Sequence, residues 1–126
     1  MPVKIDKKIL IVEHDPNFVL ILKQKFEKEG FLVVVAQDGK EGQSIFFSEK
    51  PDLVLSDVLL PIQNGVEMIK NIKDKNEDLP VILLTNVKDE NYSEAVRKMK
   101  KVDYLIKSDV RLDAIVDRAK KKLGIK

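Results

Sequence analysis

With 126 residues, 44% of them hydrophobic and 35% charged, the chain is long enough for one domain (residues 1–126) with one core, and too apolar to be disordered. It has no cysteine and a single histidine, which excludes disulfide scaffolds, zinc–thiolate sites, iron–sulfur clusters and thiol nucleophiles. The formal net charge of +2 gives no general case for binding nucleic acid or a membrane.

Short apolar runs rich in β-branched residues alternate with longer amphipathic segments. The first run, residues 9–12, is too short for a signal sequence or a membrane span, so we expect a cytoplasmic protein. Continuous apolar runs are typical of strands that helices cover on both faces. In chain order, the sequence predicts a strand at 9–12, a helix at 16–29, a strand at 32–36, a helix at 40–48, a strand at 53–55, a helix at 65–73, a strand at 81–84, a helix at 91–99, a strand at 104–106 and a helix at 111–123.

The first helix has the clearest ends. Asp15 offers a capping oxygen, Pro16 suits the first helical position, and Gly30 follows where a helix-terminating glycine belongs. Five strand–helix units with right-handed crossovers predict an α/β fold, a (βα)5 doubly wound three-layer sandwich with a five-stranded parallel sheet. Ligands of such sheets bind beyond the carboxyl ends of the strands.

Polar residues directly follow four of the predicted strands. Glu13, His14 and Asp15 follow the first strand, and the later strands are followed by Asp57, Thr85 and Lys107. Carboxylates and lysines rarely lie near a core unless they are paired, so this set predicts a site at one edge of the sheet. For any one of these residues alone, a helix cap or an exposed loop position is the more ordinary explanation, and only the set together indicates a site.

The chemistry that this set favours is phosphoryl transfer to a carboxylate. Asp57 would be the nucleophile that forms an acyl phosphate, while carboxylates after the first strand would hold a hard cation such as Mg²⁺. The Lys107 ammonium and the Thr85 hydroxyl would face the phosphoryl oxygens and stabilise their charge.

Four stretches carry a resemblance to a known family. In chain order they are ILIVEHDP, PDLVLSDVLLPIQNG, LPVILLTN and DYLIKSD. Together they resemble the receiver domain of two-component response regulators over nearly the whole chain, and the resemblance implies the flavodoxin-like strand order 2-1-3-4-5. The spacings, 28 residues from Asp57 to Thr85 and 22 from Thr85 to Lys107, fit that family.

The resemblance implies a role for each matching residue. Asp57 would be the phosphoacceptor, and Thr85 and Lys107 would be the switch hydroxyl and the invariant lysine. Tyr104 would be the aromatic switch, or alternatively a partly buried aromatic at the sheet edge. For Mg²⁺, the implied ligands are the side chains of Glu13, His14 and Asp57 and the backbone carbonyl of Leu59, with Pro61 and Gly65 shaping the loop beyond.

Several positions depart from the family pattern. His14 stands where a second acidic residue usually binds the metal, and imidazole suits Mg²⁺ poorly, so we expect weak Mg²⁺ binding. Ser108 replaces the proline after Lys107, which predicts a trans bond there. Asn86 replaces a small residue near the site entrance. Leu59 and Val87 cannot hydrogen-bond a hydrolytic water, so we expect a long-lived phosphorylated state.

These residues leave two functions open. The first is a phosphorelay switch that takes its phosphoryl group from a histidine kinase or phosphotransfer protein and signals through a face of the fourth helix, fifth strand and fifth helix. The second is a pseudo-receiver, a protein-binding module without phosphotransfer, which His14 and Ser108 favour. An enzyme is not expected, because a phosphatase would need an acid at position 59. Nucleotide binding is not expected either, because the loop after the first strand has no glycine.

The charge of the chain is unevenly distributed. Residues 91–126 carry 11 basic and five acidic side chains, whereas residues 1–90 carry 12 basic and 16 acidic ones. The basic excess indicates either lysine-covered helix exteriors or a docking face for a protein partner. We expect output through protein contact rather than through nucleic acid.

Overall fold

The computed structural model describes residues 4–86 and 90–125. Strands and helices alternate along the chain as predicted, and the ends of each lie within two residues of the predicted positions. In chain order the elements are β1 (Lys8–Val12), α1 (Pro16–Lys28), β2 (Leu32–Ala36), α2 (Gly39–Glu49), β3 (Leu53–Asp57), α3 (Gly65–Lys73), β4 (Val81–Thr85), α4 (Glu90–Arg97), β5 (Val102–Ile106), the 3₁₀ turn η1 (Lys107–Asp109) and α5 (Leu112–Lys122).

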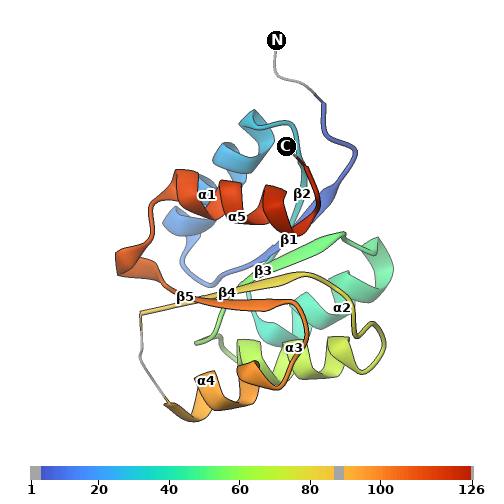
Figure 1. Ribbon diagram of the computed structural model, residues 1–126, viewed down its shortest axis with the longest axis vertical. Helices are drawn as coiled ribbons and strands as arrows, with labels where there is room; N and C mark the ends of the chain where they lie inside the picture. Colours follow the sequence, from blue (N-terminus) through green and yellow to red (C-terminus); the bar gives the residue numbers. More distant parts are fainter. Residues whose placement is uncertain (1–3, 87–89, 126) are drawn as a thin grey trace.

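The five strands form one parallel sheet in the order β2-β1-β3-β4-β5, which confirms the predicted fold. Helices α1 and α5 cover one face of the sheet, and α2, α3 and α4 cover the other (Figure 1). Each face has its own apolar cluster, one including Phe26 and Ile115 and the other including Phe46 and Ile69. The sheet is therefore buried on both sides, as continuous apolar runs require.

Strand β3 extends two residues further than its apolar run. Ser56 and Asp57 continue the β3 ladder and pair with Leu83 and Leu84 of β4, so β3 ends at the predicted phosphoacceptor rather than two residues before it. Backbone hydrogen bonds hold these polar residues in the strand although their side chains have no apolar character. The carboxylate of Asp57 is consequently attached to the last residue pair of the β3–β4 ladder.

Side-chain caps fix where three helices begin. Asp15 accepts from the Asn17 N–H (3.0 Å) at the start of α1, Asp38 from the Glu41 N–H (2.7 Å) at α2, and Asn64 from the Glu67 N–H (2.9 Å) at α3. Each cap satisfies a backbone donor that has no partner within its helix. These caps place the first turns of α1, α2 and α3 next to the carboxyl ends of the strands.

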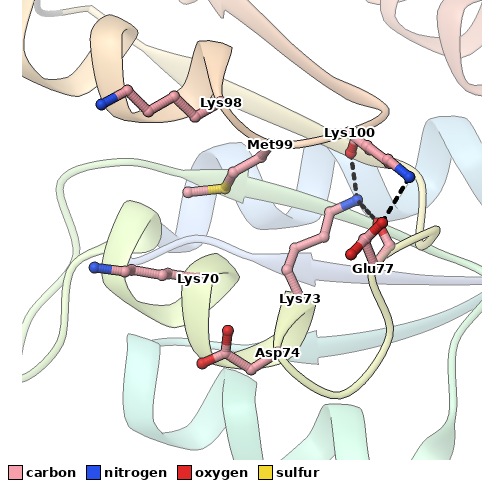
Figure 2. A pocket seen from close by; sticks show the side chains of 7 residues that line it. All are labelled: Lys70, Lys73, Asp74, Glu77, Lys98, Met99 and Lys100. Carbon is pink, nitrogen blue, oxygen red and sulfur yellow. Dashed lines mark hydrogen bonds and ion pairs between the residues drawn. The ribbon is translucent and has the colours of Figure 1, made fainter.

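At the last residue of α3, Lys73 binds the backbone near the amino ends of β4 and β5. Only 9% of Lys73 is exposed, and its Nζ donates to the carbonyls of Glu77 (2.8 Å), Leu79 and Lys100. Figure 2 shows Lys73 between Glu77 and Lys100. An ammonium has three N–H donors, so these three carbonyls satisfy it completely. The contacts tie the end of α3 to the turn that enters β5.

Burial of this ammonium predicts a measurable pH dependence of stability. Burial lowers the pKa of Lys73 from 10.5 to about 8; the charges of Lys122 and Lys101 act in the same direction, and those of Asp78 and Glu77 oppose them. Between these two values the unfolded chain keeps a proton that the folded protein has released. The free energy of unfolding should therefore rise with pH across this range, by about 3 kcal/mol from this group.

Urea unfolding of the wild type and of Lys73→Met, near pH 7.5 and near pH 10, measures this contribution. The other lysines titrate in both proteins and cancel in the difference. The wild type should gain stability relative to the variant at the higher pH. A difference between the two proteins that stays constant with pH would contradict this assignment.

Among the described residues, no helix combines the length and the apolar character needed to span a membrane.

Candidate phosphoacceptor site

Three charged side chains from three strand ends meet at the carboxyl edge of the sheet. Glu13 follows β1, Asp57 ends β3, and Lys107 follows β5. The Lys107 Nζ lies 2.8 Å from Asp57 Oδ2, 3.0 Å from Glu13 Oε1 and 3.1 Å from Glu13 Oε2. The side chains are 16%, 13% and 4% exposed for Lys107, Asp57 and Glu13, so this is a largely buried cluster of one cation between two anions.

The carboxylate of Asp57 is held at both oxygens. Oδ2 accepts from Lys107, and Oδ1 accepts from the backbone N–H of Leu59 at 3.2 Å. Behind it, α3 approaches so closely that a Cβ on Gly65 would lie 2.0 Å from the Asp57 carbonyl oxygen. Only glycine fits at this position, which agrees with the expectation that Gly65 shapes the loop after Asp57.

Burial and pairing shift the acid–base equilibria of the cluster. Burial raises the pKa of Glu13, the hydrogen bond from Lys107 opposes this, and the negative charge of Asp57 adds to it. Burial alone would lower the pKa of Lys107, but its hydrogen bonds to Asp57 and Glu13 outweigh the burial and raise the pKa overall. Lys107 therefore remains an ammonium at neutral pH and supplies a fixed positive charge beside the Asp57 oxygens.

Phe18 completes the surroundings of Lys107 from the side of α1. The Lys107 Nζ lies 4.6 Å from the centre of the Phe18 ring, a distance suited to a cation–π interaction. Sequence reasoning placed Phe18 only on the apolar face of the first helix and missed this contact. No spacing in the sequence indicates it, because it depends on how α1 packs beside the end of β5.

The remaining predicted site residues lie around this cluster at different depths. Thr85 is fully buried at the last position of β4, one residue beyond the partner of Asp57 in the ladder. Tyr104 is half-buried on β5 and packs against the apolar cluster under α2, α3 and α4. His14 is exposed. Among the described residues, no three His, Cys, Asp or Glu side chains form a group that could hold a metal ion.

The positions at which the sequence differs from the receiver-domain pattern lie in the loops beside the site. Leu59 is 50% exposed, and Asn86 and Ser108 are also exposed. No cis peptide bond occurs in the described ranges, so the predicted trans link between Lys107 and Ser108 is confirmed. Val87, the second residue expected to shield the phosphoryl group, lies outside the described residues.

The loop after Asp57 also contains a feature that sequence reasoning missed. Ile62 has a φ of 70°, is 78% exposed, and is spanned by a hydrogen bond from the Gln63 N–H to the Pro61 carbonyl at 2.7 Å. β-branched residues seldom adopt positive φ, because Cβ then crowds the backbone. The tight turn therefore holds Ile62 in a strained conformation next to the predicted loop residue Pro61.

Comparison with known proteins agrees with this arrangement. The family model for the response regulator receiver domain matches residues 9–120. The chain is 35% identical over 91 residues to the alkaline phosphatase synthesis transcriptional regulatory protein PhoP of Bacillus subtilis, covering 72% of this chain and 38% of that protein. The chain thus spans well under half the length of this curated relative.

Solved structures give the same result. The receiver domain of the Francisella response regulator 1452 has a TM-score of 0.84 at 28% identity, covering 94% of this chain and 98% of that one. A CheY-like response regulator receiver domain protein from Methanospirillum hungatei has a TM-score of 0.89 at 26% identity, covering 95% of each chain. The polar strand ends, the strand order and the family match together lead to one conclusion: this chain belongs to the response regulator receiver domain family.

Proposed function

We propose that this chain is a phosphoacceptor switch in a phosphorelay. The observation that carries the proposal is the Lys107 ammonium 2.8 Å from Asp57 Oδ2, in a largely buried cluster. A carboxylate oxygen of Asp57 attacks the phosphorus of a phosphohistidine on a histidine kinase or phosphotransfer protein. The P–N bond breaks, the electron pair and a proton stay with the departing imidazole, and an acyl phosphate forms on Asp57.

The neighbouring side chains would act on the charge that moves in this step. Lys107 faces the phosphoryl oxygens as a fixed cation, and the Thr85 hydroxyl donates to them from the end of β4. The added phosphoryl group carries a charge of about −1.5 to −2, so it changes the electrostatic and hydrogen-bonding interactions of Lys107 and Thr85. Tyr104, which packs under α4, would respond to that change and alter the face formed by α4, β5 and α5.

The donor set also suits Mg²⁺, which receiver domains generally bind at the phosphorylation site. The carboxylates of Glu13 and Asp57 both contact the Lys107 Nζ, so their oxygens lie near each other, and hard oxygen donors are what Mg²⁺ prefers. These two side chains and the Leu59 backbone carbonyl would hold the ion. When bound, it would supply positive charge to the phosphoryl oxygens.

A pseudo-receiver that binds a protein partner without phosphotransfer is the second candidate. One observation favours it: His14 is exposed and occupies the position of a metal-binding carboxylate in the family pattern. Lys107 pairs with both Glu13 and Asp57, so one of the two negative charges is balanced by the chain itself.

Treatment with a small acyl phosphate in the presence of Mg²⁺, followed by intact-mass measurement, separates the two candidates. A switch should gain about 80 Da, and Asp57→Asn, which keeps the size of the side chain, should gain nothing. The absence of an adduct on the wild type at saturating Mg²⁺ would favour the pseudo-receiver. An adduct that persists in Asp57→Asn would place the modification elsewhere.

The His14→Asp variant tests the metal site separately. The new carboxylate gives Mg²⁺ an oxygen donor in place of imidazole, so Mg²⁺ affinity should increase. A Mg²⁺ titration of both proteins at one pH, followed by the amide chemical shifts in NMR spectra, measures this affinity. A Mn²⁺ titration is the control, because Mn²⁺ accepts imidazole more readily and should gain less. Equal Mg²⁺ affinities of the two proteins would contradict the interpretation that His14 weakens Mg²⁺ binding.

A further inference from the structure

The outer surface of α2 and α3 is hollowed beside an exposed aromatic side chain. The two helices pack against each other under the sheet (Figure 1). Their close approach needs Gly42, where a Cβ would lie 2.6 Å from Met68 Sδ. Two hollows of about 340 Å³ each open on this surface, and Phe47, which is 43% exposed, lines both of them. We call the two hollows together the α2–α3 groove.

The charged side chains that line the groove are all lysines. Lys40 lines one hollow, and Lys50 and Lys75 line the other, each of them exposed. Within the described lining of these hollows there is no carboxylate. This is not a consequence of overall composition, because residues 1–90 contain 12 basic and 16 acidic side chains. The positive charge of the groove is therefore local.

Amide side chains and a fixed aromatic complete the lining. Asn71 Nδ2 donates to Gln43 Oε1 at 3.1 Å across the helix pair, which leaves the second amide donor of Asn71 for another acceptor. Phe47 is held edge-on against the buried Phe46 ring, with ring centres 5.3 Å apart. An aromatic in a defined position among polar groups is typical of residues that anchor a partner segment.

We propose that the α2–α3 groove binds an acidic segment of a partner protein that inserts an apolar side chain against Phe47. Carboxylates of the segment would pair with Lys40, Lys50 and Lys75, and its apolar side chain would cover the exposed part of the Phe47 ring. Complementary charge of this kind directs the choice and the orientation of a partner. The groove is formed by helices other than α4 and α5, so it is distinct from the output face of the proposed switch.

The probe that tests this is a short capped peptide of aspartate and glutamate with a central Phe-Leu pair, titrated into the ¹⁵N-labelled full chain. Amide shifts should change along α2 and α3. The triple variant Lys40→Glu, Lys50→Glu, Lys75→Glu should weaken binding by about tenfold or more, because attraction becomes repulsion. Phe47→Ser, which leaves every charge in place, should weaken it as well.

Matched controls distinguish a groove from general attraction between charges. A second triple variant reverses the same number of exposed lysines on α1, directly after α4 and on α5, namely Lys28→Glu, Lys98→Glu and Lys121→Glu. Equal loss of affinity in both triple variants, or shift changes centred on α5, would overturn the proposal. So would tighter binding of a single-stranded oligonucleotide at the same lysines, or a dimer in sedimentation that Phe47→Ser abolishes. None of these readouts depends on phosphorylation of Asp57.

Discussion

Replacing Lys107 with methionine should slow phosphorylation of Asp57 by about 10²–10³-fold, the usual cost of removing one preorganised electrostatic donor. The ammonium lies 2.8 Å from the oxygen that would carry the phosphoryl group, and few water molecules can take its place in a cluster this buried. Methionine keeps much of the length of the side chain, so the change removes mainly the charge, together with its interaction with the Phe18 ring.

The rate of adduct formation from a small acyl phosphate at saturating Mg²⁺, followed by intact mass, measures this effect. Lys107→Arg is the matched control, because it keeps the positive charge and should retain part of the rate. Circular dichroism of each variant checks that the fold is intact. An unchanged rate in Lys107→Met would mean that the ammonium only balances Glu13 and Asp57 and has no part in the transfer.

The double variant Leu59→Asn, Val87→Glu should lose its phosphoryl group about 10²-fold faster than the wild type. Hydrolysis needs a water in line with the departing carboxylate, and the wild-type side chains at these positions have no group that could orient it. Leu59 is 50% exposed beside the Asp57 carboxylate, where a polar side chain would reach such a water. The contribution of Val87 rests on the family pattern, because it lies outside the described residues.

Loss of the adduct with time, at saturating Mg²⁺, is the measurement. His14 is unchanged in this variant, so weak metal binding affects both proteins equally. Ile62→Asn serves as a control, since it places a polar side chain in the same loop, at a position 78% exposed. If the double variant loses its adduct no faster than the wild type, Leu59 and Val87 have no effect on hydrolysis. Equal acceleration by Ile62→Asn would show that any change in the loop opens the site to water.

Local signals in the sequence were enough to predict the order and type of the elements. Apolar runs identify strands because side chains on both faces of a covered sheet must be apolar. Capping residues such as Asp15 mark helix starts because they act within one turn. The strand ends were less predictable: Ser56 and Asp57 look like loop residues in the sequence, yet ladder hydrogen bonds to β4 keep them in the sheet.

The candidate site was predicted in part for the same reason. Parallel strands present their carboxyl ends at one edge, so residues that follow apolar runs can be expected there together. That argument places Glu13, Asp57 and Lys107 at one edge but cannot say which of them touch. It also placed His14 with them, whereas that side chain is exposed.

The sequence by itself thus determined the alternating elements, the sheet with both faces covered, and the edge at which the polar residues gather, because all of these follow from periodicity and caps over a few residues. Only the tertiary structure decided that Lys107 bridges Asp57 and Glu13, 50 and 94 residues away, that Phe18 lies against it, and that Lys73 is buried among backbone carbonyls. Such contacts depend on distances of a few ångströms between elements far apart in the chain. Those distances are set by the packing of helices on the sheet, which no local pattern records.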